Sequence, residues 1–192
     1  MIKLKDNDIR DVLLNDLYTK HSNDTNTKIV NEMGVLHGQS RVDVAVINGV
    51  LHGYEIKSES DNLLRLPSQI KDYNLVFERM TIVVQRKYLE EVRSMIPRWW
   101  GIILVTSQNN NINLRVLRKG KKNPTLDPFA LSSLLWKDEA LEILKKRDLQ
   151  KGYLSKPRKV IYQKMSESLS VAEIKYFVNE QLKSREDWRY LE

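Results

Sequence analysis

The sequence contains no cysteine among its 192 residues. This absence excludes disulfide bonds, thiolate metal sites and a cysteine nucleophile, and it agrees with a reducing cytoplasm. No apolar run approaches the roughly 18 residues that span a bilayer. The opening stretch MIKLKDNDIR also lacks the apolar core of a signal peptide. We therefore expect a cytoplasmic protein without a membrane partner.

Internal repeats and low-complexity tracts are likewise missing, and the composition is that of an ordinary soluble protein. Hydrophobic residues make up 41% and charged residues 30% of the chain. Lysine and arginine number 32 against 25 acidic residues, which gives a formal net charge of +7. A basic surface favours a polyanionic partner without proving one.

Apolar periodicity predicts a mixed α/β domain followed by helices. We divide the chain into an α/β core, residues 1–124, and an all-helical C-terminal region, residues 125–192. Helices are expected over 8–18, 63–77 and 86–96 in the core and in four segments beyond Asp127. Strands are expected over 41–47, 50–58, 80–85, 101–107 and 112–118.

The stretch HGYEIKSESD reads as a strand that ends in a polar loop. In an alternating strand Glu55 and Lys57 share one face. That places a carboxylate and an ammonium where a buried strand normally carries apolar side chains. Such an arrangement calls for a chemical explanation.

The turn at Asn48-Gly49 decides whether a second acid joins that face. A two-residue loop places Asp43 opposite Tyr54, on the other side from Glu55. A three-residue loop with a left-handed glycine and a bulge pairs Asp43 with Gly53, diagonal to Glu55. We predict the three-residue loop, because only this loop brings the acids and the lysine together.

Two neighbouring carboxylates repel each other by several kcal/mol at about 4–5 Å and an effective dielectric of 20. Lys57 offsets part of this repulsion, and a bound divalent cation offsets more. Hard oxygen ligands without histidine or cysteine clusters favour Mg²⁺, with Mn²⁺ as a substitute. Glu32 precedes the hairpin and can supply a third carboxylate. Gly53 leaves room beside Glu55 for backbone or substrate.

Asp43 followed by Glu55-Ile56-Lys57, with Glu32 upstream, resembles the PD-(D/E)XK, or restriction-endonuclease-like, nuclease superfamily. The segment Gln69-Ile-Lys-Asp-Tyr73 is similar to the Gln-xxx-Tyr motif of its recombination-exonuclease branch. More closely, RVDVAVINGVLHGYEIKSESDNLLRLPSQIKDYN and PRWWGI resemble a family of small bacterial and phage proteins. The superfamily resemblance covers residues 8–118. In one departure from the pattern, Val42 and not proline precedes Asp43.

The resemblance implies a restriction-endonuclease-like mixed sheet flanked by helices, with a helical extension. It implies a Mg²⁺-dependent nuclease that hydrolyses phosphodiester bonds in DNA. Asp43, Glu55 and Glu32 would hold the metal ion, and Lys57 would orient the attacking water. Gln69 and Tyr73 would complete the catalytic group as supports of the site.

Each of these signals also has a plainer interpretation. Glu173-Ile174-Lys175 repeats the Glu-x-Lys tripeptide in a helical segment, where we expect only a solvated face. Glu32 can be a solvent-facing acid. Gln69 and Tyr73, one helical turn apart, can be a buried tyrosine with a polar neighbour.

Basic residues provide candidate phosphate contacts outside the acidic group. A basic run ends the last predicted strand and can either follow a phosphate backbone or simply keep a hairpin soluble. Arg65 extends the Gln69 stripe and can meet phosphate or lie on the surface. The nucleic-acid-binding candidates are Arg65, Arg118, Lys119, Lys121 and Lys122, with Arg115 beside them.

Two rival functions remain open beside the nuclease. One is a non-catalytic nucleic-acid-binding protein that retains the nuclease fold and reads with its helical tail. The other is a homo-oligomeric assembly module whose tail makes the contacts. DNA is the expected partner, RNA is not excluded, and a homodimer is an open prediction.

Overall fold

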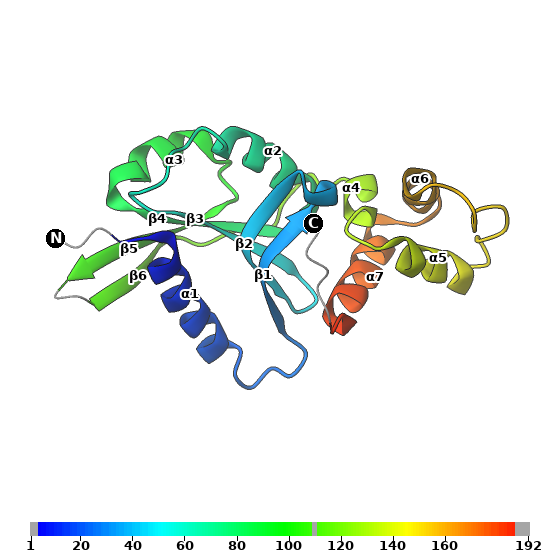
Figure 1. Ribbon diagram of the computed structural model, residues 1–192, viewed down its shortest axis with the longest axis horizontal. Coiled ribbons are helices and arrows are strands. Elements are labelled where there is room, and N and C mark those ends of the chain that lie inside the picture. Colours follow the sequence, from blue (N-terminus) through cyan, green and yellow to red (C-terminus); the bar gives the residue numbers. More distant parts are fainter. Residues whose placement is uncertain (1–3, 109–110, 187–192) are drawn as a thin grey trace.

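The computed structural model describes residues 4–108 and 111–186. Its centre is one six-stranded sheet in the order β1-β2-β3-β4-β5-β6 (Figure 1). Strands β3, β4 and β5 run parallel to one another, and the other neighbouring strands pair antiparallel. The strands are β1 (Lys28–Val35), β2 (Ser40–Ile47), β3 (Leu51–Lys57), β4 (Arg79–Gln85), β5 (Gly101–Gln108) and β6 (Asn111–Arg118). The predicted mixed α/β architecture is confirmed.

The β2–β3 hairpin has the predicted three-residue loop, but the loop lies one residue later than predicted. Ile47 pairs with Leu51, so residues 48–50 form the loop, and Gly49 adopts a φ of +87°. Both paired side chains are fully buried, which holds them in the strands. Gly53 pairs with Ala45, and no bulge interrupts the pairing. Because Ala45 pairs with Gly53, the predicted pairing of Asp43 with Gly53 is wrong, and the same register continued by one residue places Asp43 opposite Glu55.

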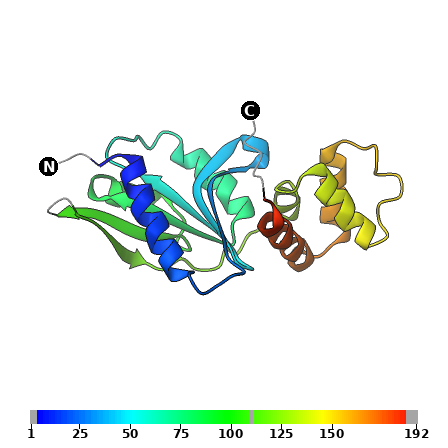
Figure 2. The ribbon, with the colours of Figure 1, turned by 60° about the horizontal axis from the view of Figure 1, so that its bottom comes forward.

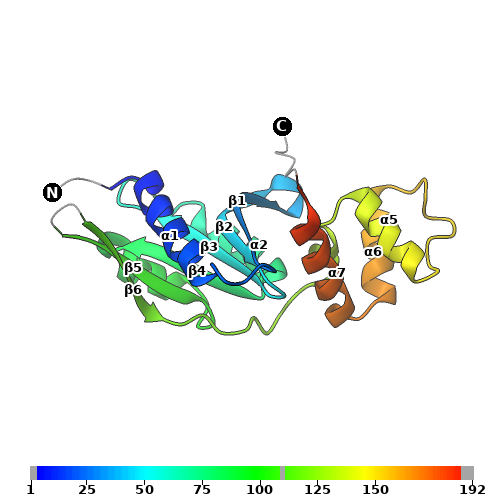
Figure 3. The ribbon, with the colours of Figure 1, turned by 90° about the horizontal axis from the view of Figure 1, so that it is seen from below.

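Helix α1 (Asp6–Lys20) covers one face of the sheet, as Figures 2 and 3 show. Its apolar residues recur at a spacing of four, so that one stripe is buried. This stripe packs on alternate side chains of the central strands, among them Tyr54 and Ile56 of β3. Packing fixes the start of α1 near the end of β3, because the helix lies across that strand.

Helices α2 (Leu66–Val76) and α3 (Leu89–Met95) cover the opposite face. Pro67 lies in the first turn of α2, where its missing N–H costs no helical hydrogen bond. A Cβ atom on Gly53 would lie 2.5 Å from Met80 Sδ and 3.1 Å from Phe77. The space beside Gly53 is therefore filled by the core, and our expectation of room for substrate there is wrong.

The C-terminal region consists of helices at one end of the sheet (Figure 1). They share one buried apolar cluster with α2 and α3, because their inward side chains continue the same core. The helices of this region are α4 (Pro128–Ser132), α5 (Lys137–Lys146), α6 (Arg158–Ser168) and α7 (Val171–Ser184).

Short 3₁₀ turns occur in the α/β core, at η1 (Leu36–Gly38) and η2 (Arg86–Tyr88).

The second Glu-x-Lys tripeptide is only partly a solvated face. Glu173 caps the start of α7 through Ser170, as an exposed acid in a first turn should. Lys175 is largely covered and forms an ion pair with the buried carboxylate of Glu78. This lysine therefore ties α7 to the sheet.

Within residues 4–108 and 111–186, no helix has the length and apolar character needed to cross a membrane.

Candidate active site

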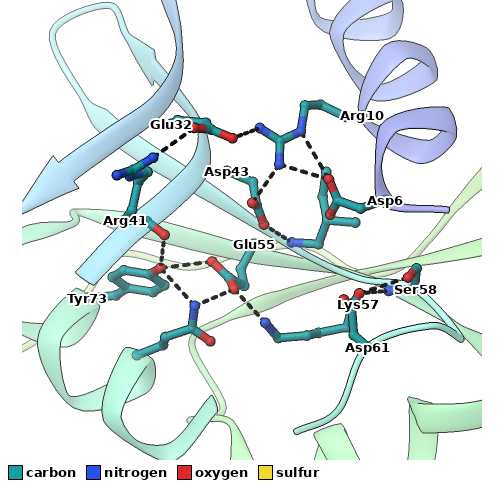
Figure 4. A network of polar contacts seen from close by, with 12 residues as sticks. Asp6, Arg10, Glu32, Arg41, Asp43, Glu55, Lys57, Ser58, Asp61 and Tyr73 are labelled. Atoms are coloured by element: carbon teal, nitrogen blue, oxygen red, sulfur yellow. Dashed lines mark hydrogen bonds and ion pairs between the residues drawn. The ribbon is translucent and has the colours of Figure 1, made fainter. Parts of the chain in front are cut away.

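An open cavity of about 560 Å³ lies where β2 begins and β3 ends, beside the first turns of α1 and α2 (Figure 4). Antiparallel strands that are joined by a hairpin meet at this edge of the sheet, so the start of one lies beside the end of the other. Its lining is almost entirely polar. The lining residues are Asp6, Arg10, Glu32, Gly38, Gln39, Ser40, Arg41, Asp43, Glu55, Ile56, Lys57, Asp61, Arg65, Ser68 and Gln69.

Glu55 is the most deeply buried acid of the cavity, with 2% of its surface exposed. Its Oε1 accepts hydrogen bonds from Lys57 Nζ and from Gln69 Nε2, both at 2.7 Å. Its Oε2 accepts one from the Tyr73 hydroxyl at 2.8 Å. Burial raises the pKa of Glu55, while Lys57 opposes that rise. The structure thus brings together four of the predicted residues.

Asp43 lies at the same cavity with its carboxylate held from two sides. Its Oδ2 accepts from the backbone N–H of Ile56 at 2.6 Å, and its Oδ1 accepts from Arg10 Nη2 at 2.9 Å. Burial, reinforced by the nearby negative charge of Glu55, raises the pKa of Asp43 to about 7. The negative charge of Glu55 therefore acts on the carboxyl of Asp43, and both residues line the same cavity.

Arg10, like Arg41, lines the cavity but was not predicted from the sequence. From α1, its guanidinium contacts Asp6 at 2.8 Å, Asp43 at 2.9 Å and Glu32 at 3.1 Å. A planar fork of N–H donors suits several carboxylates at once. The spacing of Asp6 and Arg10 at i and i+4 was a readable signal, but nothing in the sequence placed α1 across the end of β3.

Glu32 of β1 faces the cavity at its more exposed rim. Its carboxylate accepts from Arg41 Nη1 at 3.0 Å and from Arg10 Nη1 at 3.1 Å. The hydrogen bond from Arg41 and the charge of Arg10 lower the pKa of Glu32. Its backbone adopts a φ of +51°, a conformation that costs a non-glycine residue about 1–3 kcal/mol. Glu32 and Asp43 are thus connected through one arginine.

The residues present fit a hard divalent cation in part. In the described part of the chain, no cluster of three or more His, Cys, Asp or Glu side chains is arranged to hold a metal ion. Arg10 and Lys57 instead balance the two central acids. However, Gln69 Oε1 is buried with no hydrogen-bond partner among the described residues. Gln69 lines the cavity with Asp43 and Glu55, and amide and carboxylate oxygens are donor types that suit Mg²⁺ or Mn²⁺.

Tyr73 supports Glu55, and its removal should measurably destabilise the fold. Its hydroxyl contacts Glu55 Oε2 at 2.8 Å and the Arg41 carbonyl at 2.7 Å. We expect Tyr73→Phe to lower the free energy of unfolding by about 1–3 kcal/mol, because it strips a buried donor from a carboxylate. Chemical denaturation measures this change.

Tyr162→Phe is the matched control for that substitution. Among the described residues, the buried Tyr162 hydroxyl has one hydrogen-bond partner, the Leu135 carbonyl, at 2.6 Å. A neutral bond of this kind contributes about 1 kcal/mol. An equal loss of stability in the two variants would show that Tyr73 gives Glu55 no special support.

The predicted phosphate contacts separate into two groups. Arg65 is exposed and lines the cavity at the start of α2. Arg118 instead donates from Nε to the Trp100 carbonyl at 2.7 Å and from Nη2 to the Pro97 carbonyl at 3.2 Å. Because Arg118 pairs with Ile102 near the start of β5, the basic run that it begins lies at the sheet edge opposite the cavity.

Lys119, Lys121 and Lys122 remain predicted phosphate contacts with a direct test. Replacing the three with glutamine should make the negative slope of log affinity against log salt shallower by up to about 2.7 for duplex DNA. Each phosphate contact contributes about 0.9 to this slope. Fluorescence titrations at several salt concentrations give the slope. An unchanged slope would assign these lysines to solubility.

The sheet with helices on both faces, the helical C-terminal region and the polar cavity define a mixed α/β protein. The chain belongs to the family described as Bacteriophage P4 protein cII, whose family model matches residues 2–190. Protein cII of Enterobacteria phage P4 is 29% identical over 182 residues, which are 95% of this chain and 68% of that protein.

One solved structure is also similar, a protein of unknown function from Silicibacter pomeroyi. It is 16% identical, with 72% of this chain and 89% of that chain covered, and the TM-score is 0.39. That likeness is too weak to bear on the fold or the function of this protein.

Proposed function

We propose that the protein is a metal-dependent nuclease with a restriction-endonuclease-like core that hydrolyses phosphodiester bonds in DNA. The observation that carries the proposal is the placement of Asp43, Glu55 and Lys57 at one cavity from two neighbouring strands. Gln69 and Tyr73 support the same proposal, because both donate to Glu55 as the resemblance implied.

Asp43 and Glu55 are the residues that would hold Mg²⁺, and Gln69 lines the same cavity. When bound, the cation supplies Lewis-acid polarisation of a phosphate oxygen and a water of lowered pKa. Burial raises the pKa of both carboxyls, and the charge of Glu55 raises that of Asp43 further, so both gain from such a cation. Glu32 is the candidate for a further ligand at the rim.

Lys57 is the group that would act on the attacking water. Its ammonium lies 2.7 Å from Glu55 Oε1, which fixes the long side chain at the cavity. An ammonium in that position can orient a water molecule by hydrogen bonding and can balance charge that develops on the phosphate. Gln69 and Tyr73 hold Glu55, so Lys57 keeps its position through Glu55.

Two arginines at the cavity suit the phosphates of the substrate. Arg65 is exposed at the first turn of α2, and Arg41 is exposed beside Glu32. Arginine binds phosphate oxygens through two parallel N–H donors, so both can position a backbone without reading its sequence.

Cleavage of a panel of labelled nucleic acids tests the proposal. The panel contains single-stranded DNA, duplex DNA, a junction and RNA, each incubated with Mg²⁺, Mn²⁺ or EDTA. We expect at least one DNA substrate to be cut with either metal ion, none with EDTA, and none by the Glu55→Gln variant. Intact substrates throughout, with folded protein, would contradict the proposal.

A non-catalytic nucleic-acid-binding protein is the second candidate. It is favoured by the ion pairs of Arg10 with Asp43 and of Lys57 with Glu55, which balance both acids without a metal ion. The panel separates the two candidates, because a pure binding protein retards these substrates in a gel without cutting them. Gel filtration of the same sample tests the predicted homodimer.

A further inference from the structure

A large excess of positive charge lies in one short part of the helical region. Residues 145–164 contain eight lysines and arginines and a single acid, Asp148. Their excess of seven positive charges equals the formal net charge of the whole chain, +7. This segment, here called the basic patch, comprises the end of α5, the loop after it and the first two turns of α6.

The basic patch is exposed, and most of its charges have no ion-pair partner in the part of the chain that the structure describes. Seven of its eight cationic residues are exposed, and Lys164 is half-buried. Only Lys146 and Arg147 form ion pairs within residues 4–108 and 111–186, with Glu142 at 2.9 Å and Glu173 at 2.7 Å. Like charges without counter-charges repel each other. An anionic partner would therefore reduce the repulsion among the cationic side chains of the basic patch.

The composition of the basic patch favours a phosphate backbone over a membrane. An interfacial helix needs a broad apolar face beside its charges. Within the described residues, Leu154 and Val160 are the large apolar side chains that the patch exposes, at 67% and 41%. Tyr153 lies under Lys164, with Nζ 5.7 Å from the ring centroid. A half-exposed ring beside a lysine suits a nucleotide better than a lipid.

The basic patch also adjoins the rim of the candidate active site. The imidazole of His37 in η1 stacks on the Tyr162 ring of α6, with centroids 5.7 Å apart. Arg158 is near enough for its charge to contribute to lowering the pKa of His37, after burial. Gly38 and Gln39, which follow directly, line the cavity. One turn of the chain therefore lies between the patch and the cavity.

We infer that the basic patch is a second nucleic-acid-binding surface, which holds the phosphate backbone of a strand whose neighbouring part lies at the cavity. It extends the proposed function by naming where the rest of the substrate lies. Binding here needs neither the metal ion nor cleavage, so the two proposals can fail separately.

The test is an affinity measurement on the full chain in EDTA, with labelled single-stranded and duplex DNA as separate probes. The variant replaces Lys156, Arg158 and Lys159 with glutamine. We expect at least a tenfold loss of affinity near 0.1 M salt. The slope against log salt should become shallower by about 2 for the single strand or 2.7 for the duplex. The probe with the larger change identifies the form of DNA that is bound.

A matched control removes the same charge elsewhere. Lys20, Arg79 and Arg93 are exposed and none lines the cavity, so glutamine at all three should change the slope by less than 1. Equal losses in the two triple variants would overturn the inference, because the effect would then be one of net charge alone. Unchanged binding in the patch variant would overturn it too.

Two further measurements exclude other readings. Phosphatidylserine vesicles replace the DNA in one series, and binding to vesicles but not to DNA would contradict the inference. Should the first variant fold poorly, glutamine at Lys145 and Lys151 tests the same patch from α5 and the loop. DNA binding that depends on the basic patch, without any cleavage, would leave this inference intact and remove the nuclease proposal.

Discussion

Replacing Lys57 with methionine should reduce Mg²⁺-dependent cleavage by about 10³-fold or more. The substitution keeps an unbranched side chain but removes the ammonium 2.7 Å from Glu55 Oε1. Loss of a positioned acid–base or electrostatic group costs rates of this size. DNA binding in EDTA should stay nearly unchanged, because the proposed phosphate-binding residues are other arginines and lysines. A plasmid-nicking time course gives the rate.

Stability will also fall in this variant, so its control must break a similar pair. Removing one partner of a buried ion pair costs about 3–5 kcal/mol. Lys175, the lysine of the second Glu-x-Lys tripeptide, forms such a pair with Glu78. The Lys175 side chain is somewhat more exposed than that of Lys57. Lys175→Met should therefore lower stability in the same direction and leave cleavage intact. If both variants cleave DNA equally well, Lys57 has no part in the reaction.

Replacing Asp43 with asparagine should abolish metal binding and stabilise the metal-free protein at pH 8. The folded protein raises the pKa of Asp43 to about 7 from its ordinary 3.8, by burial and by the charge of Glu55. At pH 8 the parent must keep this unfavourable carboxylate ionised, whereas asparagine carries no charge. Calorimetric titration with Mn²⁺ measures the loss of binding.

The dependence on pH has a definite sign. A raised carboxyl pKa means that the folded state holds its proton more tightly than the unfolded state. The stability from Asp43 is therefore fully present below about pH 4 and lost as the pH rises through about 7. A shift of this size corresponds to at most about 4 kcal/mol. Asp43→Asn should remove this slope from the unfolding free energy.

The control for Asp43→Asn is Asp6→Asn, which affects the same arginine. Asp6 contacts Arg10 at 2.8 Å, but its carboxylate is not opposite Glu55. We expect Asp6→Asn to keep Mn²⁺ binding and to reduce the pH dependence only slightly, because burial and Glu55 raise the pKa of Asp43 more than Asp6 does. Equal metal affinities for all three proteins would show that Asp43 is not a ligand.

Local patterns in the sequence predicted α1, α2, β2 and β3 of the site, but not β1, which carries Glu32. Alternation marked β2 and β3, and the Asn48-Gly49 turn required a hairpin of either loop length. Only the chemistry of the acids selected the three-residue loop, which the structure confirms. The exact register depended instead on burial of Ile47 and Leu51, which no local pattern reveals.

Contacts between distant elements could not be predicted in the same way. Arg10 reads as a polar residue of an amphipathic helix until α1 is packed across β3. Lys175 reads as solvated until α7 meets Glu78. Gly53 reads as an opening until Met80 and Phe77 fill the space. In each case tertiary packing decides the role of the residue.

A crystal structure with Mn²⁺ tests the central claim most directly, because the ion gives an anomalous signal at its own position. One anomalous peak in contact with carboxylate oxygens of both Asp43 and Glu55, beside Lys57, is the predicted result. Crystals that contain Mn²⁺ but show no peak between those carboxylates, with Arg10 still on Asp43 and Lys57 still on Glu55, would contradict it.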